Sequence, residues 1–334
     1  MKRRTPFVAL YGFCLCLGLA ASVRAQEVKL DAPQTRMTTV SAVRARSAPQ
    51  VSATEVARLK LGTVLKATAR SAEETEIGGK RDYWYLVSLP SGQSAWVFGG
   101  LTTPFDAARR EEIVRRIIDE RLKVEGMSFD DGVDFYNFVS GALAEAKDTN
   151  AKAEFELLRL LALGRAVSPI PYAERERAPY AQWYKAHEAE IVYSEPSGQW
   201  LLRSELFWNL ERKYRATPTA ERIAWEGAEN PLPGECEGDE VCYFLYLNDT
   251  QGKYLSLYPN GAHASEVLKN FEQALASTEV ESTLKSTSRD KYLIEQRDAL
   301  KQALTQLRST VAKTSAAEKA PVLRLLERLS AAAR

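Results

Sequence analysis

The spacing of apolar residues changes at Pro104-Phe105-Asp106, and this switch constrains the fold more than any other feature of the chain. Before it, residues 36–105 hold short runs that alternate apolar and polar residues or are β-branched and aromatic, separated by turn residues. After it, apolar residues recur at helical spacing. The pattern predicts an α+β multidomain chain, in which a small N-terminal antiparallel β-barrel precedes an all-α region.

The first 25 residues have the layout of a secretory signal peptide. A basic start, an apolar run over Phe7–Ala21 and small residues on either side of Arg24 predict cleavage after Ala25. The apolar run is shorter than the roughly 20 residues of a spanning helix. No later stretch is long and apolar enough to cross a bilayer. We therefore expect an exported protein, periplasmic or extracellular, with no transmembrane segment after cleavage and a linker over residues 26–35.

The charge balance excludes one class of partner. Removing residues 1–25 takes away four of the 45 Lys and Arg residues and none of the 44 Asp and Glu residues, which leaves a net charge of about −3. Both signs are interleaved along the chain, as is typical of solvated helices. Such a chain has no long-range field to attract nucleic acid, so we expect no nucleic-acid partner.

Two cysteines remain in the mature chain, Cys236 and Cys242, in the sequence GECEGDEVCYF. An isolated close pair in an exported protein predicts a local disulfide. A zinc site is less consistent with the sequence, because the pair is widely spaced and only His187 and His263 could add imidazole ligands. The acidic residues beside the cysteines lack the spacing of a calcium-binding EF-hand. We therefore predict a disulfide, no metal and no cofactor.

Residues 106–168 contain three amphipathic segments, the first with Asp106 placed to cap it. None of the three can bury its apolar stripe alone, so we expect them to pack together as a three-helix segment. The apolar stripes are Ile113, Ile117 and Leu122 in the first, Phe135, Phe138, Val139 and Leu143 in the second, and Phe155, Leu158 and Leu161 or Ala162 in the third.

A further α-helical domain, which contains the Cys236–Cys242 loop, is predicted over residues 169–334. The sequence GKYLSLYPNGAHASEVLKNFEQAL resembles the helix–turn–helix joint of tetratricopeptide-like repeats, but no period of roughly 34 residues accompanies it. That resemblance implies helical hairpins rather than a countable array. Helices are expected over residues 178–191, 199–214, 219–229, 241–248, 264–275, 287–308 and 316–333.

Residues 36–105 resemble the bacterial SH3 domains of exported cell-envelope proteins. The first half, VRARSAPQVSATEVARLKLGTVL, is similar to the opening run of that family and carries its Gly-Thr pair at Gly62-Thr63. The second half carries the two tryptophans of the family at Trp84 and Trp96. The resemblance implies an SH3-like barrel that binds cell-wall peptides or partner proteins.

Three departures from the family pattern weaken any inherited ligand preference. In the first loop, Ala42 and Ser47-Ala48-Pro49 stand where the family has asparagine and Ser-Gly-Pro. Ala95 stands where the family has the glycine before the second tryptophan. Residues 73–80 form an insertion that extends one hairpin.

Candidate ligand-binding residues follow from strand alternation in DYWYLVSLPSGQSAWVFGG. Assigning Tyr85, Val87 and Leu89 to the core makes Trp84 face outward, where an exposed aromatic suits an extended peptide. The alternative is that the aromatic residues only cover a thin barrel. Trp96 and Phe98 are also expected to face outward. The candidates are therefore Tyr83, which lies at the start of its strand, Trp84, Trp96 and Phe98.

No catalytic constellation stands out in the mature sequence. A Ser-His-Asp or Cys-His system would have to use His187 or His263, and we expect both to be solvated. The sequence therefore favours a non-enzymatic binding or scaffold protein, whose SH3-like barrel contacts peptidoglycan peptide or glycan or an envelope protein. One alternative is a peptidoglycan-related envelope hydrolase or its regulator. Another is a purely structural protein whose barrel face packs on its own helices.

Overall fold

The computed structural model describes residues 27–333, so the predicted signal peptide and cleavage site lie outside the described residues. The described chain divides into two compact units. The first comprises residues 27–34, 44–57 and 65–100, and the second comprises residues 35–43, 58–64 and 101–333. Two short segments from the predicted barrel region therefore belong to the same unit as the helices.

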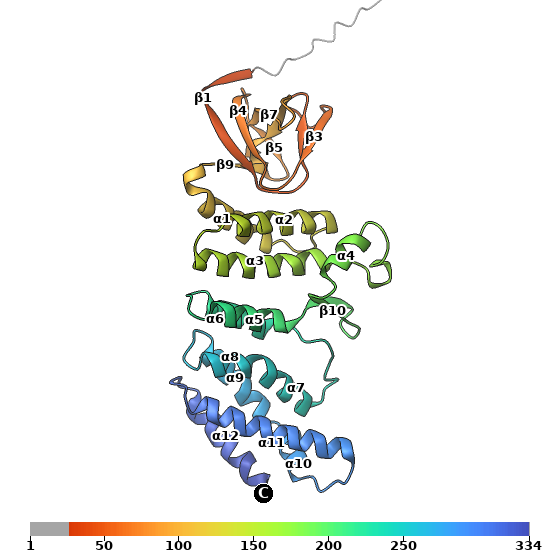
Figure 1. Cartoon of the computed structure of the whole chain (residues 1–334), viewed down its shortest axis with the longest axis vertical. Coiled ribbons are helices and arrows are strands. Elements are labelled where there is room, and N and C mark those ends of the chain that lie inside the picture. Colours follow the sequence, from red (N-terminus) through yellow and green to blue (C-terminus); the bar gives the residue numbers. More distant parts are fainter. Residues whose placement is uncertain (1–26, 334) are drawn as a thin grey trace, which may run out of the picture. The chain divides into compact units, whose positions relative to one another are not determined.

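The N-terminal strands form the predicted antiparallel sheet, which curls into a small barrel (Figure 1). Along residues 64–71, buried Leu65, Ala67 and Ala69 alternate with exposed neighbours, as expected for a strand with one face in the core. The strands are β1 (Glu27–Thr38), β2 (Val43–Arg46), β3 (Glu55–Leu59), β4 (Val64–Ser71), β7 (Trp84–Ser88), β8 (Ser94–Phe98) and β9 (Thr102–Pro104), paired in the order β3-β2-β8-β7-β4-β1-β9.

The insertion at residues 73–80 forms a hairpin of its own, β5 (Thr75–Ile77) and β6 (Lys80–Asp82). Ile77 pairs with Lys80, so Gly78 and Gly79 make the whole turn. Their φ angles are 58° and 76°. Two consecutive positive φ values match the twist of the flanking strands, and glycine adopts them without strain.

Three helices follow the barrel, as predicted: α1 (Arg110–Leu122), α2 (Phe129–Glu145) and α3 (Thr149–Val167). Asp106 caps a short 3-10 turn just before α1 by accepting a hydrogen bond from the N–H of Ala108 at 2.9 Å. The apolar faces of the three helices share one core. Met37 and Leu61, from the two N-terminal segments of the second unit, are buried in that core as well.

A β-hairpin that the sequence pattern did not predict follows α3. The helices expected over residues 178–191 and 199–214 are shorter than predicted, namely α4 (Ala181–His187) and α5 (Ser204–Tyr214). The intervening segments form the antiparallel pair β10 (Ile191–Ser194) and β11 (Gln199–Leu202). Strands of four residues are too short to show a period, and burial of Ile191, Trp200 and Leu202 in a core shared with α3 selects the extended conformation.

The remaining helices build a third core. The predicted helix–turn–helix joint is present, because one helix ends at Leu257 and the next begins at Ala264, on either side of Pro259. A helix over residues 278–285 was not predicted. The elements are α6 (Ala220–Glu229), α7 (Glu240–Leu247), a π-helical turn (Asn248–Gly252), α8 (Lys253–Leu257), α9 (Ala264–Leu275), α10 (Thr278–Lys285), α11 (Lys291–Val311) and α12 (Lys319–Ala332).

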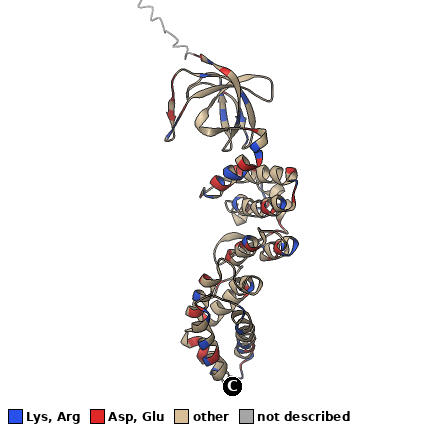
Figure 2. Cartoon of the chain, turned by 90° about the vertical axis from the view of Figure 1, so that its left-hand side faces the viewer, with Lys and Arg blue, Asp and Glu red and all other residues tan. Residues whose placement is uncertain are grey.

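Charges of both signs are interspersed along the helices on the face drawn in Figure 2. Many of them pair within one helix, for example Arg115 with Glu111 at 2.8 Å and Lys285 with Glu281 at 2.6 Å. Exposed pairs of this kind contribute little to stability, but they keep the local net charge small.

The close packing of α2 on α3 gives a first prediction. A Cβ atom at Gly132 would lie 2.6 Å from the Cα of Ala166 in α3, so the two helices would have to separate. We expect Gly132→Ala to lower the free energy of unfolding by about 1–3 kcal/mol.

Gly141, in the same helix, is the matched control. A Cβ there meets nothing within 4 Å, so Gly141→Ala should leave the free energy of unfolding unchanged or raise it by about 0.5–1 kcal/mol. Urea unfolding followed by circular dichroism measures both variants. Equal effects at the two positions would contradict the predicted clash.

Candidate functional site

The hairpin β7–β8 carries the four aromatic residues predicted to bind a ligand, and three of them are buried. Trp84 and Phe98 are each 2% exposed and Trp96 is 8% exposed, whereas Tyr83 is half-buried. The predicted outward orientation of Trp84, Trp96 and Phe98 is therefore wrong. Ligand binding at this hairpin stays a prediction. Of the four residues, Tyr83 is the one whose side chain is partly exposed and could contact a ligand. The residues assigned to the core are buried as predicted: Tyr85, Val87 and Leu89.

Strand alternation fails in this hairpin because its second face is covered too. Trp84 and Phe98 lie opposite each other in the strand register, with ring centroids 5.7 Å apart. The turn after β8 covers the Phe98 ring so closely that a Cβ at Gly100 would lie 2.6 Å from it. The backbone N–H of Trp84 donates to Ser71 Oγ at 3.0 Å in a buried position. Alternation predicts orientation only where one face of a strand meets water.

The half-buried Tyr83 has a cationic neighbour in the same unit. The guanidinium carbon of Arg70 lies 3.8 Å from the centroid of the Tyr83 ring, within the range of a cation–π contact. An aromatic ring beside a guanidinium can stack on an apolar group and donate hydrogen bonds to a carbonyl or carboxylate. These two residues are the candidate contact point of the barrel.

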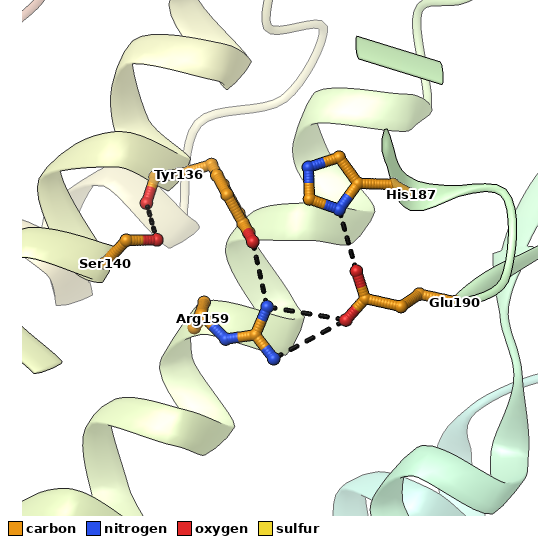
Figure 3. A network of polar contacts seen from close by, with 5 residues as sticks. All are labelled: Tyr136, Ser140, Arg159, His187 and Glu190. Carbon is orange, nitrogen blue, oxygen red and sulfur yellow. Dashed lines mark hydrogen bonds and ion pairs between the residues drawn. The ribbon is translucent and has the colours of Figure 1, made fainter. Parts of the chain in front are cut away.

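A polar network in the helical region contains one of the two histidines (Figure 3). The His187 ring nitrogen Nδ1 lies 2.7 Å from Glu190 Oε2, and Nη1 of Arg159 lies 3.4 Å from Glu190 Oε1. The same Nη1 donates to the hydroxyl of Tyr136 at 2.8 Å. The hydroxyl of Ser140 donates to the backbone carbonyl of Tyr136 at 2.8 Å. We call these five residues the His187 network.

The His187 network favours the ionised form of Glu190. The hydrogen bond from His187 is the main cause of a lowered pKa of the Glu190 carboxyl, and the charge of Arg159 contributes in the same direction. Partial burial opposes both effects. Glu190 is therefore a carboxylate that bridges α3, through Arg159, to the end of α4.

The expectation that His187 is solvated is wrong. Its side chain is 12% exposed, and its ring packs on Trp183 and Tyr136 with centroid separations of 4.4 and 5.0 Å. A histidine beside a carboxylate is also the arrangement of a general base. Here the carboxylate is shared with an arginine, and the neighbouring Ser140 hydroxyl is bonded to a backbone carbonyl instead of the imidazole.

The second histidine, His263, is half-buried and also has an aromatic neighbour. Its ring stacks on Trp225 with centroids 3.7 Å apart and an interplanar angle of 3°. Its Nδ1 lies 3.1 Å from Glu266 Oε2. Its backbone N–H donates to the hydroxyl of Tyr254 at 3.2 Å, so the residue is part of the joint between α8 and α9.

The predicted disulfide between Cys236 and Cys242 is confirmed, with an S–S distance of 2.08 Å. It closes the loop that leads into α7, where Asp239 caps the helix by accepting a hydrogen bond from the N–H of Cys242 at 2.8 Å. Among residues 27–333, no group of three or more His, Cys, Asp or Glu side chains is placed to hold a metal ion. Over the same range, no helix has the length and apolarity required to span a bilayer.

Residues 41–103 match the family model of the bacterial SH3 domain. This segment is therefore a bacterial SH3 domain, which confirms the resemblance inferred from the Gly-Thr pair and the two tryptophans. The match extends neither to β1 nor to the helices. No curated protein and no solved structure matches the chain.

Sequence reasoning missed the His187 network, in which Glu190 and Tyr136 contact His187 and Arg159 contacts both of them. The three-residue spacing of His187 and Glu190 in the sequence was a usable signal, because residues three apart can meet near a helix end. Tyr136 and Arg159 had no such signal, since they lie on α2 and α3, far from His187 in the sequence.

The burial of Trp84 leads to a second prediction. Trp84→Ala should lower the free energy of unfolding by about 3–5 kcal/mol, because it leaves a cavity against Phe98. Trp84→Phe should cost clearly less, since Nε1 makes no hydrogen bond that would be lost. Exposed Ser88→Ala is the neutral control on the same strand. Thermal unfolding measures all three, and a mild effect of Trp84→Ala would contradict the buried position.

The ionised Glu190 leads to a third prediction, on pH. Because its pKa is lower in the folded state, the stability it contributes is present above its unfolded pKa and is lost as pH falls through the folded pKa. Glu190→Gln should therefore destabilise the protein at neutral pH, and the difference from wild type should shrink between about pH 5 and pH 3. Urea unfolding at several pH values measures it. Glu188→Gln, which removes an exposed neighbouring carboxylate, is the control and should leave the free energy of unfolding at neutral pH unchanged. A pH-independent difference for Glu190→Gln would refute the assignment.

Proposed function

We propose that this protein is an exported, non-enzymatic binding or scaffold protein of the bacterial cell envelope. Its SH3 domain contacts cell-wall peptide or glycan, or an envelope protein, and its helical region docks a partner. The observation that carries the proposal is the bacterial SH3 domain at residues 41–103, because such domains commonly bind peptidoglycan.

Two features support an oxidising, exported location. The Cys236–Cys242 disulfide is a bond that persists mainly outside the cytosol. Residues 1–25 have the basic start, apolar run and small-residue end of a cleaved signal.

The contact point on the SH3 domain is the pair Tyr83 and Arg70. A stem peptide of the cell wall offers carboxylates and backbone carbonyls to the guanidinium and apolar groups to the ring. The buried aromatic residues Trp84, Trp96 and Phe98 then hold the hairpin rigid beneath Tyr83.

The proposal is tested by sedimenting the mature protein with purified peptidoglycan, which gives a fourth prediction. Tyr83→Ala should weaken binding about fivefold, because it removes one stacking and cation–π surface of roughly 1 kcal/mol. Tyr243→Ala, which removes an exposed tyrosine in the helical region, is the control and should bind as wild type. If the wild type neither sediments with peptidoglycan nor captures any envelope protein, the proposal is refuted.

The alternative function is a peptidoglycan-related hydrolase, and the pairing of His187 with Glu190 at 2.7 Å is the observation that favours it. Release of dye from labelled peptidoglycan separates the two functions. Hydrolysis by the wild type that is abolished in His187→Gln would establish the enzyme, whereas binding without dye release supports a scaffold. Binding to neither wall nor protein would favour the purely structural alternative.

A further inference from the structure

A groove of 820 Å³ opens within the second unit, at a place that neither the SH3 domain nor the His187 network uses. The β10–β11 hairpin, the loop of residues 231–236, α7 and the start of α11 line it. Figure 1 shows β10 and α7 on the same side of the second unit, with α11 running across it. The volume lies within the range of about 300–1,000 Å³ that is typical of ligand-binding clefts.

The walls of the groove are aromatic and partly open to solvent. Tyr243 on α7 is 46% exposed and Tyr292 on α11 is 64% exposed, and Leu232 and Pro233 in the loop add apolar surface. Large side chains of this kind are seldom left together on a surface unless they bind something.

The charges of the groove are all of one sign. Glu235, Asp249 and Glu295 line it, and no Lys, Arg or His does so among the residues that the structure describes. Within the described chain, Glu235 and Asp249 form no ion pair, and Glu295 meets only the highly exposed Lys291 at 3.8 Å. On the face of the helices that Figure 2 draws, by contrast, acidic and basic residues are interspersed. The residues that line the groove therefore give it a net negative charge beside aromatic rings.

Covalent and hydrogen bonds hold this groove in shape. The disulfide ties Cys236 in the loop to Cys242 on α7, and both cysteines line the wall. The backbone N–H of Leu232 donates to the hydroxyl of Tyr246 at 3.3 Å. The amide of Gln296 on α11 donates to Asp239 Oδ2 at 3.0 Å, which joins α11 to the cap of α7. A groove fixed in advance loses less entropy when a ligand binds.

We propose that this groove binds an extended basic segment of a partner protein, one in which lysine or arginine stands next to an apolar residue. The inference deepens the proposed function, because it assigns the docking site of the helical region and the chemistry of its partner. The aliphatic stems of lysine and arginine pack on Tyr243 and Tyr292, where the cations also gain cation–π energy. Glu235, Asp249 and Glu295 neutralise the charged ends, and they repel acidic peptides, nucleic acid and anionic lipid.

The test selects binders from a displayed library of random dodecapeptides on the mature protein and measures the selected peptides by fluorescence anisotropy. We expect enrichment of lysine and arginine beside apolar residues, and affinity that falls as salt rises. The double variant Tyr243→Ala, Tyr292→Ala should bind the peptides at least about tenfold more weakly. The triple variant Glu235→Gln, Asp249→Asn, Glu295→Gln should show a similar loss and a weaker dependence on salt.

Control variants distinguish an effect of the groove residues from an effect of the protein's net charge. Glu74→Gln, Glu125→Gln and Glu188→Gln together remove the same number of exposed carboxylates outside the groove and should leave peptide affinity unchanged. Replacing both Cys236 and Cys242 by serine changes no charge and should weaken binding by loosening the loop. Circular dichroism verifies the fold of each variant, and the two groove variants change different side chains, so a misfolded one leaves the other as the test.

Three outcomes would overturn the inference: selection of neutral or acidic peptides or of none, basic peptides whose affinity survives both groove variants, or displacement of the peptides by soluble peptidoglycan fragments. The last would make the wall, not a protein, the occupant. Sedimentation with peptidoglycan depends on Tyr83 and not on these residues, so a failure of the SH3 function and a failure of the groove are told apart.

Discussion

Helix α3 is buried on two opposite faces, and the cores on either side of it depend on this arrangement. Phe155 and Leu158 pack into the core shared with α1 and α2, whereas Leu157 and Leu160 pack into the core shared with β11 and α5. A helix with apolar residues on two faces must be covered on both, because each exposed leucine would forgo about 1.5–3 kcal/mol of burial. The later elements cover the second face, with Ile191 and Trp200 of the β10–β11 hairpin and Phe207 of α5 in the same core.

The fold was predictable wherever one residue pattern had one explanation. The alternation along β4 and the glycine pair at residues 78–79 determine their local structures without help from the rest of the chain. The second stripe of α3 and the β10–β11 hairpin were not predictable in this way. Leu157 and Leu160 lie next to the residues of the first stripe in the sequence, so the pattern did not identify them as a second stripe. Strands of four residues are too short for their pattern to be distinguished from that of a helix.

The candidate sites also differ in how far the sequence could predict them. The predicted exported location and the even number of cysteines were enough to pair Cys236 with Cys242, because two close cysteines in an exported chain have few other options. The orientation of Trp84 was not predictable, since the turn at Gly100 and the opposing Phe98 cover a face that alternation assigns to water. The environment of His187 was equally hidden, because it is assembled from three separate helices.

Electrostatics links the mixed surface to the two proposed binding regions. Opposite charges a few ångströms apart cancel beyond the screening length, which is about 10 Å in ordinary salt, so paired helices such as α10, with Lys285 on Glu281, exert no field on a distant partner. A patch with an excess of one sign acts differently, because part of its charge is not cancelled. The groove has such a patch of carboxylates, whereas Tyr83 in the SH3 domain is accompanied by the guanidinium of Arg70. The two regions therefore favour ligands of opposite charge, so the proposed wall peptide and the proposed basic segment would not compete for one site.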